Sequence, residues 1–139
     1  MMTTRSPACP LWRLPDDMST ATQALLLFAH GSSEPAWASP FRQLQTIMQA
    51  RAPDRIIELA FLERMSPDFD AAVAALAAQG VRSITVAPIF LAIGGHMKHD
   101  LPKLVDSAAL RTGIEFRILP ALGEVDTLLE AIAAWVLLA

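Results

Sequence analysis

Short apolar runs alternate with longer amphipathic segments along most of this chain. Four such runs, Ala24–Ala29, Arg55–Phe61, Ser83–Phe90 and Ile114–Leu119, each have the length of a single strand. Most residues in the first three runs are apolar, which is typical of strands buried on both faces of a parallel sheet. The pattern therefore predicts a sheet of four parallel strands.

The segments between the strands predict helices. After the first strand, an apolar stripe at helical spacing is formed by Trp37, Phe41, Leu44 and Met48. The second helix is expected to open at Ser66–Pro67–Asp68 and to end at Gly80. Ser66 is the predicted cap, and Pro67 takes the first helical position, where its missing N–H costs nothing.

Two further helices complete the predicted pattern. The third is expected from Asp100 to about Leu110, with Gly113 ending it. The last helix carries an apolar stripe formed by Val125, Leu128, Leu129, Ile132 and Val136. Each predicted strand is thus followed by one helix.

Strands that alternate with helices form a parallel sheet through right-handed crossovers. The predicted fold class is α/β: a three-layer sandwich with a four-stranded parallel sheet in the order 2-1-3-4 and helices on both faces, as in flavodoxin-like proteins. We expect residues 23–139 to form this single domain. Residues 1–22, which contain three prolines and no periodic pattern, are expected to be an N-terminal tail.

Two histidines stand at the predicted ligand crevice, which lies outside the carboxyl ends of the first and third strands. His30 ends the first strand, His96 follows the third, and both are next to glycine. Glu63 follows the second strand and can reach the same edge. Two imidazoles and a carboxylate suit a divalent transition metal, and a set smaller than four leaves positions open for catalysis or metal transfer.

Simpler interpretations exist for each of these residues. His30 or His96 could be a hydrogen-bonded loop residue, and Glu63 could only cap the turn that follows it. His99 is expected to be an exposed residue of the third helix's first turn. The joint placement of the two strand-end histidines at one crevice favours a functional site.

Composition narrows the function classes. A net charge of −3 argues against non-specific nucleic-acid binding, which requires a basic surface. Cys9 is the only cysteine, so no internal disulfide can form. No apolar run has the length of a membrane span, and the first 15 residues lack the apolar core of a signal peptide. We therefore expect a cytoplasmic protein.

The order and spacing of several short motifs resemble one known family. The motifs are His30–Gly31–Ser32, Ala60–Phe61–Leu62–Glu63, Pro67, Pro88–Ile89–Phe90–Leu91, Gly94, His96, Asp100–Leu101–Pro102 and Leu122–Gly123. Over about residues 24–137 the chain is similar to the class II chelatases of the sirohydrochlorin chelatase type (CbiX and SirB). Its length matches the short, single-domain form.

This resemblance implies insertion of a divalent metal into sirohydrochlorin, an acidic tetrapyrrole, on the way to cobalamin or siroheme. Cobalt and iron are the metals implied, with nickel as a further candidate, and the metal is a substrate rather than a permanently bound cofactor. The family's two metal-site histidines match His30 and His96, and its acidic residue matches Glu63. The resemblance also implies a homodimer, with which the apolar ending Trp135–Ala139 agrees.

The chemistry fits these residue types. Two pyrrole N–H protons must leave while the metal exchanges its ligands for ring nitrogens, and an imidazole can accept protons near neutral pH. We expect His30 and His96 to present the metal, at least one of them acting as base. Glu63 would be a further ligand or would fix an imidazole tautomer.

The peripheral carboxylates of the substrate need cationic or N–H partners. The nearest candidates by sequence are Gly31, Ser32, Ser33, Gly94, Gly95 and Lys98. The chain departs from the family pattern after its first motif, where Ser33–Glu34–Pro35 stands in place of the usual Arg or Lys. This departure predicts that a contact to a substrate anion is missing here, which leaves a divergent substrate or a lost activity open.

Other function classes stay open. A non-catalytic metal-binding protein or metallochaperone would use the same histidines without turnover. A histidine phosphatase would need several arginines around phosphate, an α/β-hydrolase a GxSxG turn, and a dinucleotide-binding domain a GxGxxG turn after the first strand. The last two patterns are absent from the sequence. A purely structural interaction domain would leave both strand-end histidines unexplained.

Overall fold

The computed structural model describes residues 22–139. The elements are β1 (Gln23–Ala29), η2 (Pro35–Ala38), α1 (Ser39–Arg51), β2 (Ile56–Phe61), α2 (Phe69–Ala78), β3 (Ser83–Pro88), α3 (Gly95–Thr112), β4 (Glu115–Ile118), η3 (Leu122–Glu124) and α4 (Asp126–Leu137). Within these residues, no helix combines the length and the apolar character that crossing a bilayer requires. Residues 1–21, and with them nearly all of the expected tail and Cys9, lie outside the described residues.

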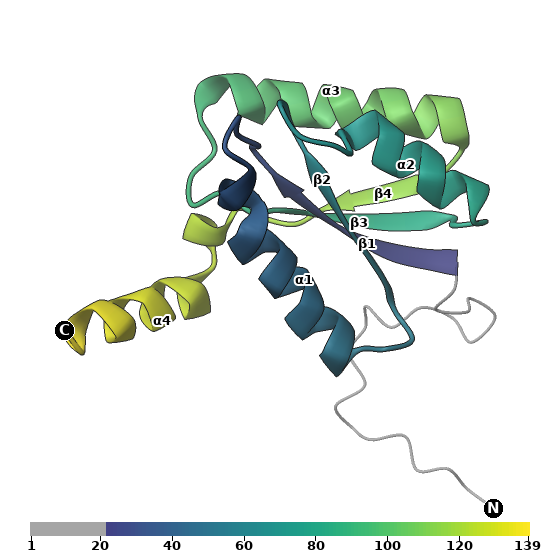
Figure 1. Cartoon of the computed structure of the whole chain (residues 1–139). Coiled ribbons are helices and arrows are strands. Elements are labelled where there is room, and N and C mark those ends of the chain that lie inside the picture. The colour runs from purple at the N-terminus through teal and green to yellow at the C-terminus, as the bar shows by residue number, and fades with distance from the viewer. Residues whose placement is uncertain (1–21) are drawn as a thin grey trace, which may run out of the picture.

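The four strands form one parallel sheet in the order β2-β1-β3-β4, which confirms the predicted topology. In this order β1 has β2 on one side and β3 on the other, so the chain reverses its direction of winding between them. The carboxyl ends of β1, β2 and β3 therefore meet at one edge of the sheet (Figure 1).

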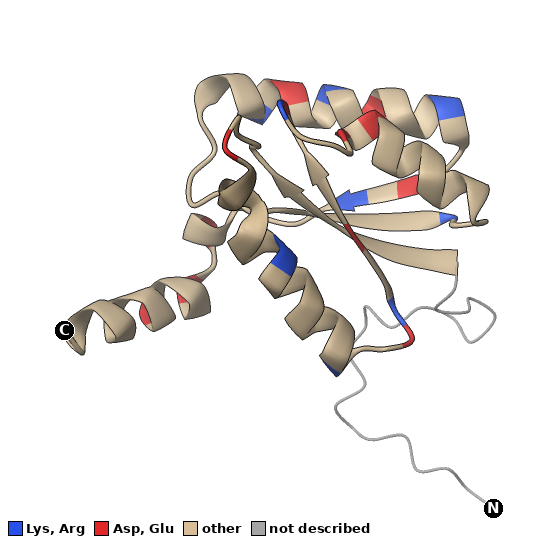
Figure 2. Ribbon diagram, in the orientation of Figure 1, with Lys and Arg blue, Asp and Glu red and all other residues tan. Residues whose placement is uncertain are grey.

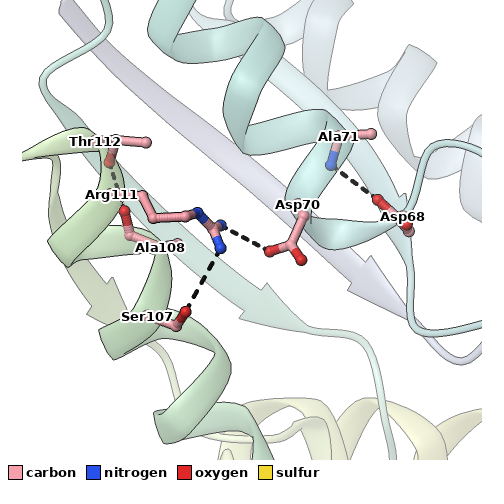
Figure 3. A network of polar contacts seen from close by, with 7 residues as sticks. All are labelled: Asp68, Asp70, Ala71, Ser107, Ala108, Arg111 and Thr112. Atoms are coloured by element: carbon pink, nitrogen blue, oxygen red, sulfur yellow. Dashed lines mark hydrogen bonds and ion pairs between the residues drawn. The ribbon is translucent and has the colours of Figure 1, made fainter.

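The face of the sheet under α2 and α3 holds the larger apolar core. At its centre, the ring of Phe28 meets those of Phe69 and Phe90 edge to face, with centroids 5.5 and 5.9 Å apart. Val73 and Leu76 of α2 are fully buried against it. At the surface, α3 and α2 are joined by an ion pair in which an Arg111 Nη atom lies 2.9 Å from Asp70 Oδ1 (Figure 3).

The opposite face is covered less completely. α1 packs chiefly on β2, where Trp37, Phe41 and Leu44 lie against a smaller cluster around Leu59 and Phe61. α4 has no buried residue and packs mainly against the short η3 that precedes it. Figure 1 shows α4 extending away from the sheet. Three helices thus cover the two faces, and the fourth stands apart.

Two helix starts differ from the sequence-based expectation. The cap of α2 is Asp68, whose Oδ1 accepts a hydrogen bond from the Ala71 amide at 2.8 Å, so the prediction of Ser66 as cap and Pro67 as the first helical residue was wrong. A helix that started at Pro67 would begin before the bridge between Phe61 and Asp68, which keeps this segment extended.

The third helix begins earlier than predicted, at Gly95 rather than Asp100. Proline usually disrupts a helix interior, because it lacks an N–H and its ring crowds the preceding turn. Pro102 lies inside α3 at an exposed position, where water can solvate the carbonyl group left without a donor. His96 is therefore part of the first turn of α3 rather than of a preceding loop.

Candidate functional site

The ends of β1 and β2 hold His30 and Glu63 next to each other through the backbone. The Leu62 amide donates to the Ala29 carbonyl at 2.8 Å, and the Glu63 amide donates to the His30 carbonyl at 3.1 Å. The hydrogen-bond ladder thus runs past both strands to the two predicted site residues. Gly31 follows with φ +92°, and a Cβ there would run into the Glu63 carbonyl oxygen, so the close approach requires glycine.

The His30 side chain lies on the apolar rim of β3. Its ring centroid is 4.5 Å from that of Phe90, with the planes inclined by 49°. His30 is nevertheless exposed, and within residues 22–139 its imidazole makes no hydrogen bond or ion pair; the same holds for Glu63. Both side chains are free to bind a ligand at this edge.

Some backbone N–H groups of the segment after His30 are already used in hydrogen bonds within that segment. Ser32 Oγ accepts from the Glu34 amide at 3.1 Å, so this amide already has a partner. Ser33 is exposed, and η2 then begins with Pro35, which has no N–H to offer. The backbone donors left for a substrate anion here are those of Gly31, Ser32 and Ser33.

The start of α3 presents the second group of predicted residues. Gly94 is the cap, Gly95 begins the helix, and the Lys98 amide closes the first turn on the Gly94 carbonyl at 3.1 Å. His96 and Lys98 are both exposed there. His99 is exposed as well, as expected for a residue outside the site. The start of α3 thus presents the His96 imidazole, the Lys98 ammonium and free backbone amides to solvent at one place.

A complete metal site is not formed within one chain. Among the described residues, no three or more His, Cys, Asp or Glu side chains lie close enough together to hold an ion. The backbone brings His30 and Glu63 together, but the set of His30, His96 and Glu63 is not assembled as a three-ligand cluster. Their roles as metal ligands therefore stay a prediction.

Sequence reasoning missed one basic residue at this edge, Arg64. It directly follows Glu63, is exposed, and has φ +65°. An open cavity of about 520 Å³ lies along the β2–α2 connection and is lined by Leu62, Glu63, Arg64, Met65, Ser66, Pro67, Asp68 and Ala71. A cation next to an acidic residue at a strand end was the signal that could have identified it.

Comparison with known proteins identifies the family. The CbiX family model matches residues 24–137, nearly all of the described chain. The sirohydrochlorin cobaltochelatase of Methanothermobacter thermautotrophicus is 36% identical over 81 residues, which cover 58% of this chain and 56% of that protein. The one from Sulfurisphaera tokodaii is 29% identical over 106 residues, covering 76% and 84%. Over its matched part, the chain thus spans about half the length of the first of these relatives.

Solved structures agree with the sequence comparisons. A protein from Marinobacter aquaeolei VT8, described as a cobalamin (vitamin B12) biosynthesis CbiX protein, has a TM-score of 0.74 and 30% identity, covering 82% of this chain and 93% of that one. The sirohydrochlorin chelatase SirB of Bacillus subtilis subspecies spizizenii, solved with cobalt, has a TM-score of 0.65 and 27% identity, covering 73% and 44%. Sequence and fold agree, and the chain belongs to the CbiX family.

Proposed function

We propose that this protein is a sirohydrochlorin chelatase, which inserts a divalent metal, cobalt or iron, into the tetrapyrrole in cobalamin or siroheme biosynthesis. The observation that carries the proposal is the match to the CbiX family over residues 24–137, with an unpartnered His30 at the carboxyl edge of the sheet. Relatives named sirohydrochlorin cobaltochelatase support the tetrapyrrole substrate, and the SirB structure solved with cobalt supports a metal substrate.

His30 and His96 are the proposed metal-binding and proton-accepting groups. Their imidazoles are exposed and unpartnered, which suits a metal that must arrive hydrated and leave for the ring nitrogens. A site with few protein ligands releases a metal more readily than a closed four-ligand site does. As the metal leaves, an imidazole becomes free to take a pyrrole proton. Glu63 is proposed to complete the metal's ligands or to orient an imidazole.

The substrate carboxylates are proposed to bind between the two glycine-rich segments of the edge. The amides of Gly31, Ser32 and Ser33 lie on one side, and those of Gly94 and Gly95 with the Lys98 ammonium lie at the start of α3. Free N–H groups at a helix start attract anions, and an ammonium adds charge-assisted hydrogen bonds. No permanently bound cofactor enters this scheme.

The direct test is anaerobic incubation of the purified protein with sirohydrochlorin and Co(II), Fe(II) or Ni(II), following the visible absorption of the ring. We expect multiple turnovers with at least one metal, and a loss of at least roughly a hundredfold in His30→Ala and His96→Ala. His99→Ala is the matched control, since His99 lies on the same helix as His96 and is equally exposed but is no proposed ligand.

The same experiment addresses the alternative function. A metallochaperone of this fold would bind the metal through the same histidines without accelerating its insertion. Metal binding by the folded protein with no turnover on any of the three metals would therefore replace the chelatase proposal with that alternative. Turnover that survives both histidine substitutions would exclude the proposed catalytic residues.

We further propose that the protein acts as a homodimer formed through α4. This helix exposes seven large apolar side chains, on Leu128, Leu129, Ile132, Trp135, Val136, Leu137 and the following Leu138, and Trp135 is 73% exposed. Monomeric proteins rarely leave a contiguous apolar surface of this kind uncovered. A second copy offers the same helix and the same sheet, so each face can be covered reciprocally around a two-fold axis.

The sheet carries a matching surface. On the face that holds α1, the register places Leu25, Thr85 and Arg117 in one row across β1, β3 and β4, with Ala87 next along β3. All four are at least partly exposed, and α1 lies chiefly over β2. The charged residues of α4, Asp126 and Glu130, are both acidic, whereas Arg117 has no partner among the described residues.

The short η3 that precedes α4 is held closely against the β3–α3 connection, and from there α4 extends away from the sheet (Figure 1). The amides of Leu122 and Gly123 donate to the Phe90 and Leu91 carbonyls at 2.9 and 2.8 Å, and a Cβ on Gly123 would run into the Leu91 carbonyl oxygen. This close seat supports a partner chain, rather than the same chain, as the surface that α4 covers.

A further inference from the structure

Arg64 has a backbone conformation that its side chain disfavours. Its φ of +65° lies in the left-handed region, and it is the only non-glycine residue of the described chain with a positive φ. L-residues other than asparagine and aspartate rarely adopt this conformation, because Cβ approaches the following carbonyl oxygen. A long basic side chain at such a position calls for a compensating contact.

The conformation is imposed by the backbone on both sides. The Glu63 amide is tied to the His30 carbonyl, and Gly31 packs directly against the Glu63 carbonyl. On the far side the Phe61 amide donates to the Pro67 carbonyl at 2.9 Å, which closes the loop that contains Arg64. The loop is therefore held by main-chain contacts, and none of them depends on the Arg64 side chain.

Within residues 22–139 the Arg64 guanidinium contacts no other polar or aromatic group. The two carboxylates that share its cavity, on Glu63 and Asp68, form no ion pair with it, and Asp68 is engaged as the cap of α2. Because this carboxylate already satisfies the start of α2, the helix end offers no place for an anion. Among the residues that line this cavity, Arg64 is the only one with a positively charged side chain.

The other arginines of the neighbourhood are occupied or lie elsewhere. Arg111 pairs with Asp70 on the outer surface, and Arg42 lies 6.0 Å from the Phe61 ring centroid. Arg55 and Arg82 precede β2 and β3 and therefore stand at the opposite edge of the sheet. Figure 2 shows acidic and basic residues spread over the whole molecule rather than gathered into one basic surface. An unpaired guanidinium directly after Glu63 is thus a local feature of the candidate site.

We infer that Arg64 binds a peripheral carboxylate of the tetrapyrrole in the cavity beside Glu63, and so helps to select polycarboxylated rings. A guanidinium can form two parallel hydrogen bonds to one carboxylate, which fixes orientation as well as charge. The main-chain bonds that hold this loop offset the backbone cost of an arginine there, and strained residues held in this way are typical of binding sites. This inference rests on the proposed function, since it takes sirohydrochlorin as the ligand.

The test is a fluorescence titration of the metal-free protein with sirohydrochlorin, using wild type, Arg64→Asn, Arg64→Gly and Arg64→Lys. Asparagine and glycine tolerate a positive φ and remove the charge, whereas lysine keeps the charge without the bidentate geometry. We expect Kd to rise roughly tenfold in the Asn and Gly variants and less in the Lys variant. Added salt should reduce these differences.

Stability measurements separate this role from a structural one. Urea denaturation should show Arg64→Gly and Arg64→Asn to be at least as stable as wild type, because the disfavoured conformation is relieved. Arg51→Asn is the control, since Arg51 is an exposed arginine of the last turn of α1, and its Kd should equal that of wild type. Equal Kd values in wild type and Arg64→Asn would overturn the inference about Arg64 and leave the proposed function standing. A wild type that does not bind sirohydrochlorin would overturn the proposed function with it.

Discussion

The two faces of the sheet are covered to different degrees, although the same four strands supply both. Under α2 and α3, Phe28, Val73 and Leu76 are fully buried in one continuous core. On the other face α1 covers β2, while Leu25 and Ala87 stay partly exposed and α4 buries nothing. A parallel sheet needs cover on both faces. Within residues 22–139 one face is fully covered, and we propose that a second copy of the chain covers the open part of the other.

The two faces of the sheet therefore differ in what they can stabilise. The closed face joins segments from β1 to Ile114 and can stabilise a single chain. On the open face α4 extends away from the sheet, and we propose that it gains stability by packing on a second copy (Figure 1). The candidate site lies at the carboxyl edge, where backbone bonds hold His30 next to Glu63 and the His30 ring packs on Phe90 at the margin of the larger core. Substitutions on the two faces should therefore have different consequences.

The largest effect is expected on the closed face. Phe28→Ala removes a ring that is fully buried against Phe69 and Phe90, and should lower the free energy of unfolding by about 3–5 kcal/mol. Leu25→Ala, in the same strand but on the open face and only partly buried, is the matched control and should cost clearly less. Urea denaturation of both variants tests this. Equal losses would mean that the two faces contribute alike.

The next effect concerns association rather than folding. Trp135→Glu places a charge in the apolar face of α4 and should weaken the dimer by about 2–4 kcal/mol, since buried tryptophans dominate interface energies. Light scattering after size-exclusion chromatography should show a dimer for wild type and a monomer for the variant. Thr127→Glu, an exposed polar position of the same helix, should stay dimeric. A monomeric wild type would contradict the proposed use of the open face.

A smaller effect is expected where the two faces end. Gly31→Ala combines a disfavoured φ of +92° with a collision against the Glu63 carbonyl, and should cost about 2–3 kcal/mol while separating His30 from Glu63. Gly80→Ala is the control, because Gly80 has a similar φ of +85° but open space around it, and should cost about 1 kcal/mol. Unfolding and turnover are both measured. Equal losses would show that the close approach to Glu63 is unimportant.

Much of the fold followed from the sequence because it depends on local patterns. The strand order, and the placement of His30 and Glu63 at the ends of neighbouring strands, need only the alternation of apolar runs with helices and the crossover rule. The start of α3 was placed five residues too late because Gly94 and Gly95 read as a loop, and no side chain caps the helix to mark its true start. The cap of α2 was misjudged because Asp68 follows an extended segment that only pairing with Phe61 explains.

The surfaces were less predictable. The apolar stripe of the last helix showed that one side of it must be covered, but a stripe does not specify whether the covering surface belongs to the same chain. The conformation of Arg64 arises from long-range backbone bonds between β1, β2 and the loop before α2, so no local pattern indicates it. The three-ligand metal set was inferred from strand ends together with the family resemblance, and shared placement at an edge does not determine side-chain distances.

The smallest effect is expected at the surface of the closed face. Arg111 and Asp70 join α3 to α2 at 2.9 Å, but about half of each side chain is exposed, so solvent screens the pair (Figure 3). A double-mutant cycle with Arg111→Gln and Asp70→Asn should therefore give a coupling energy of about 0.5 kcal/mol or less, and less still in high salt. A coupling well above 1 kcal/mol would assign the pair a real share of this face's stability. The expected small value would instead place that stability in the apolar core beneath, where Phe28 and Leu76 lie.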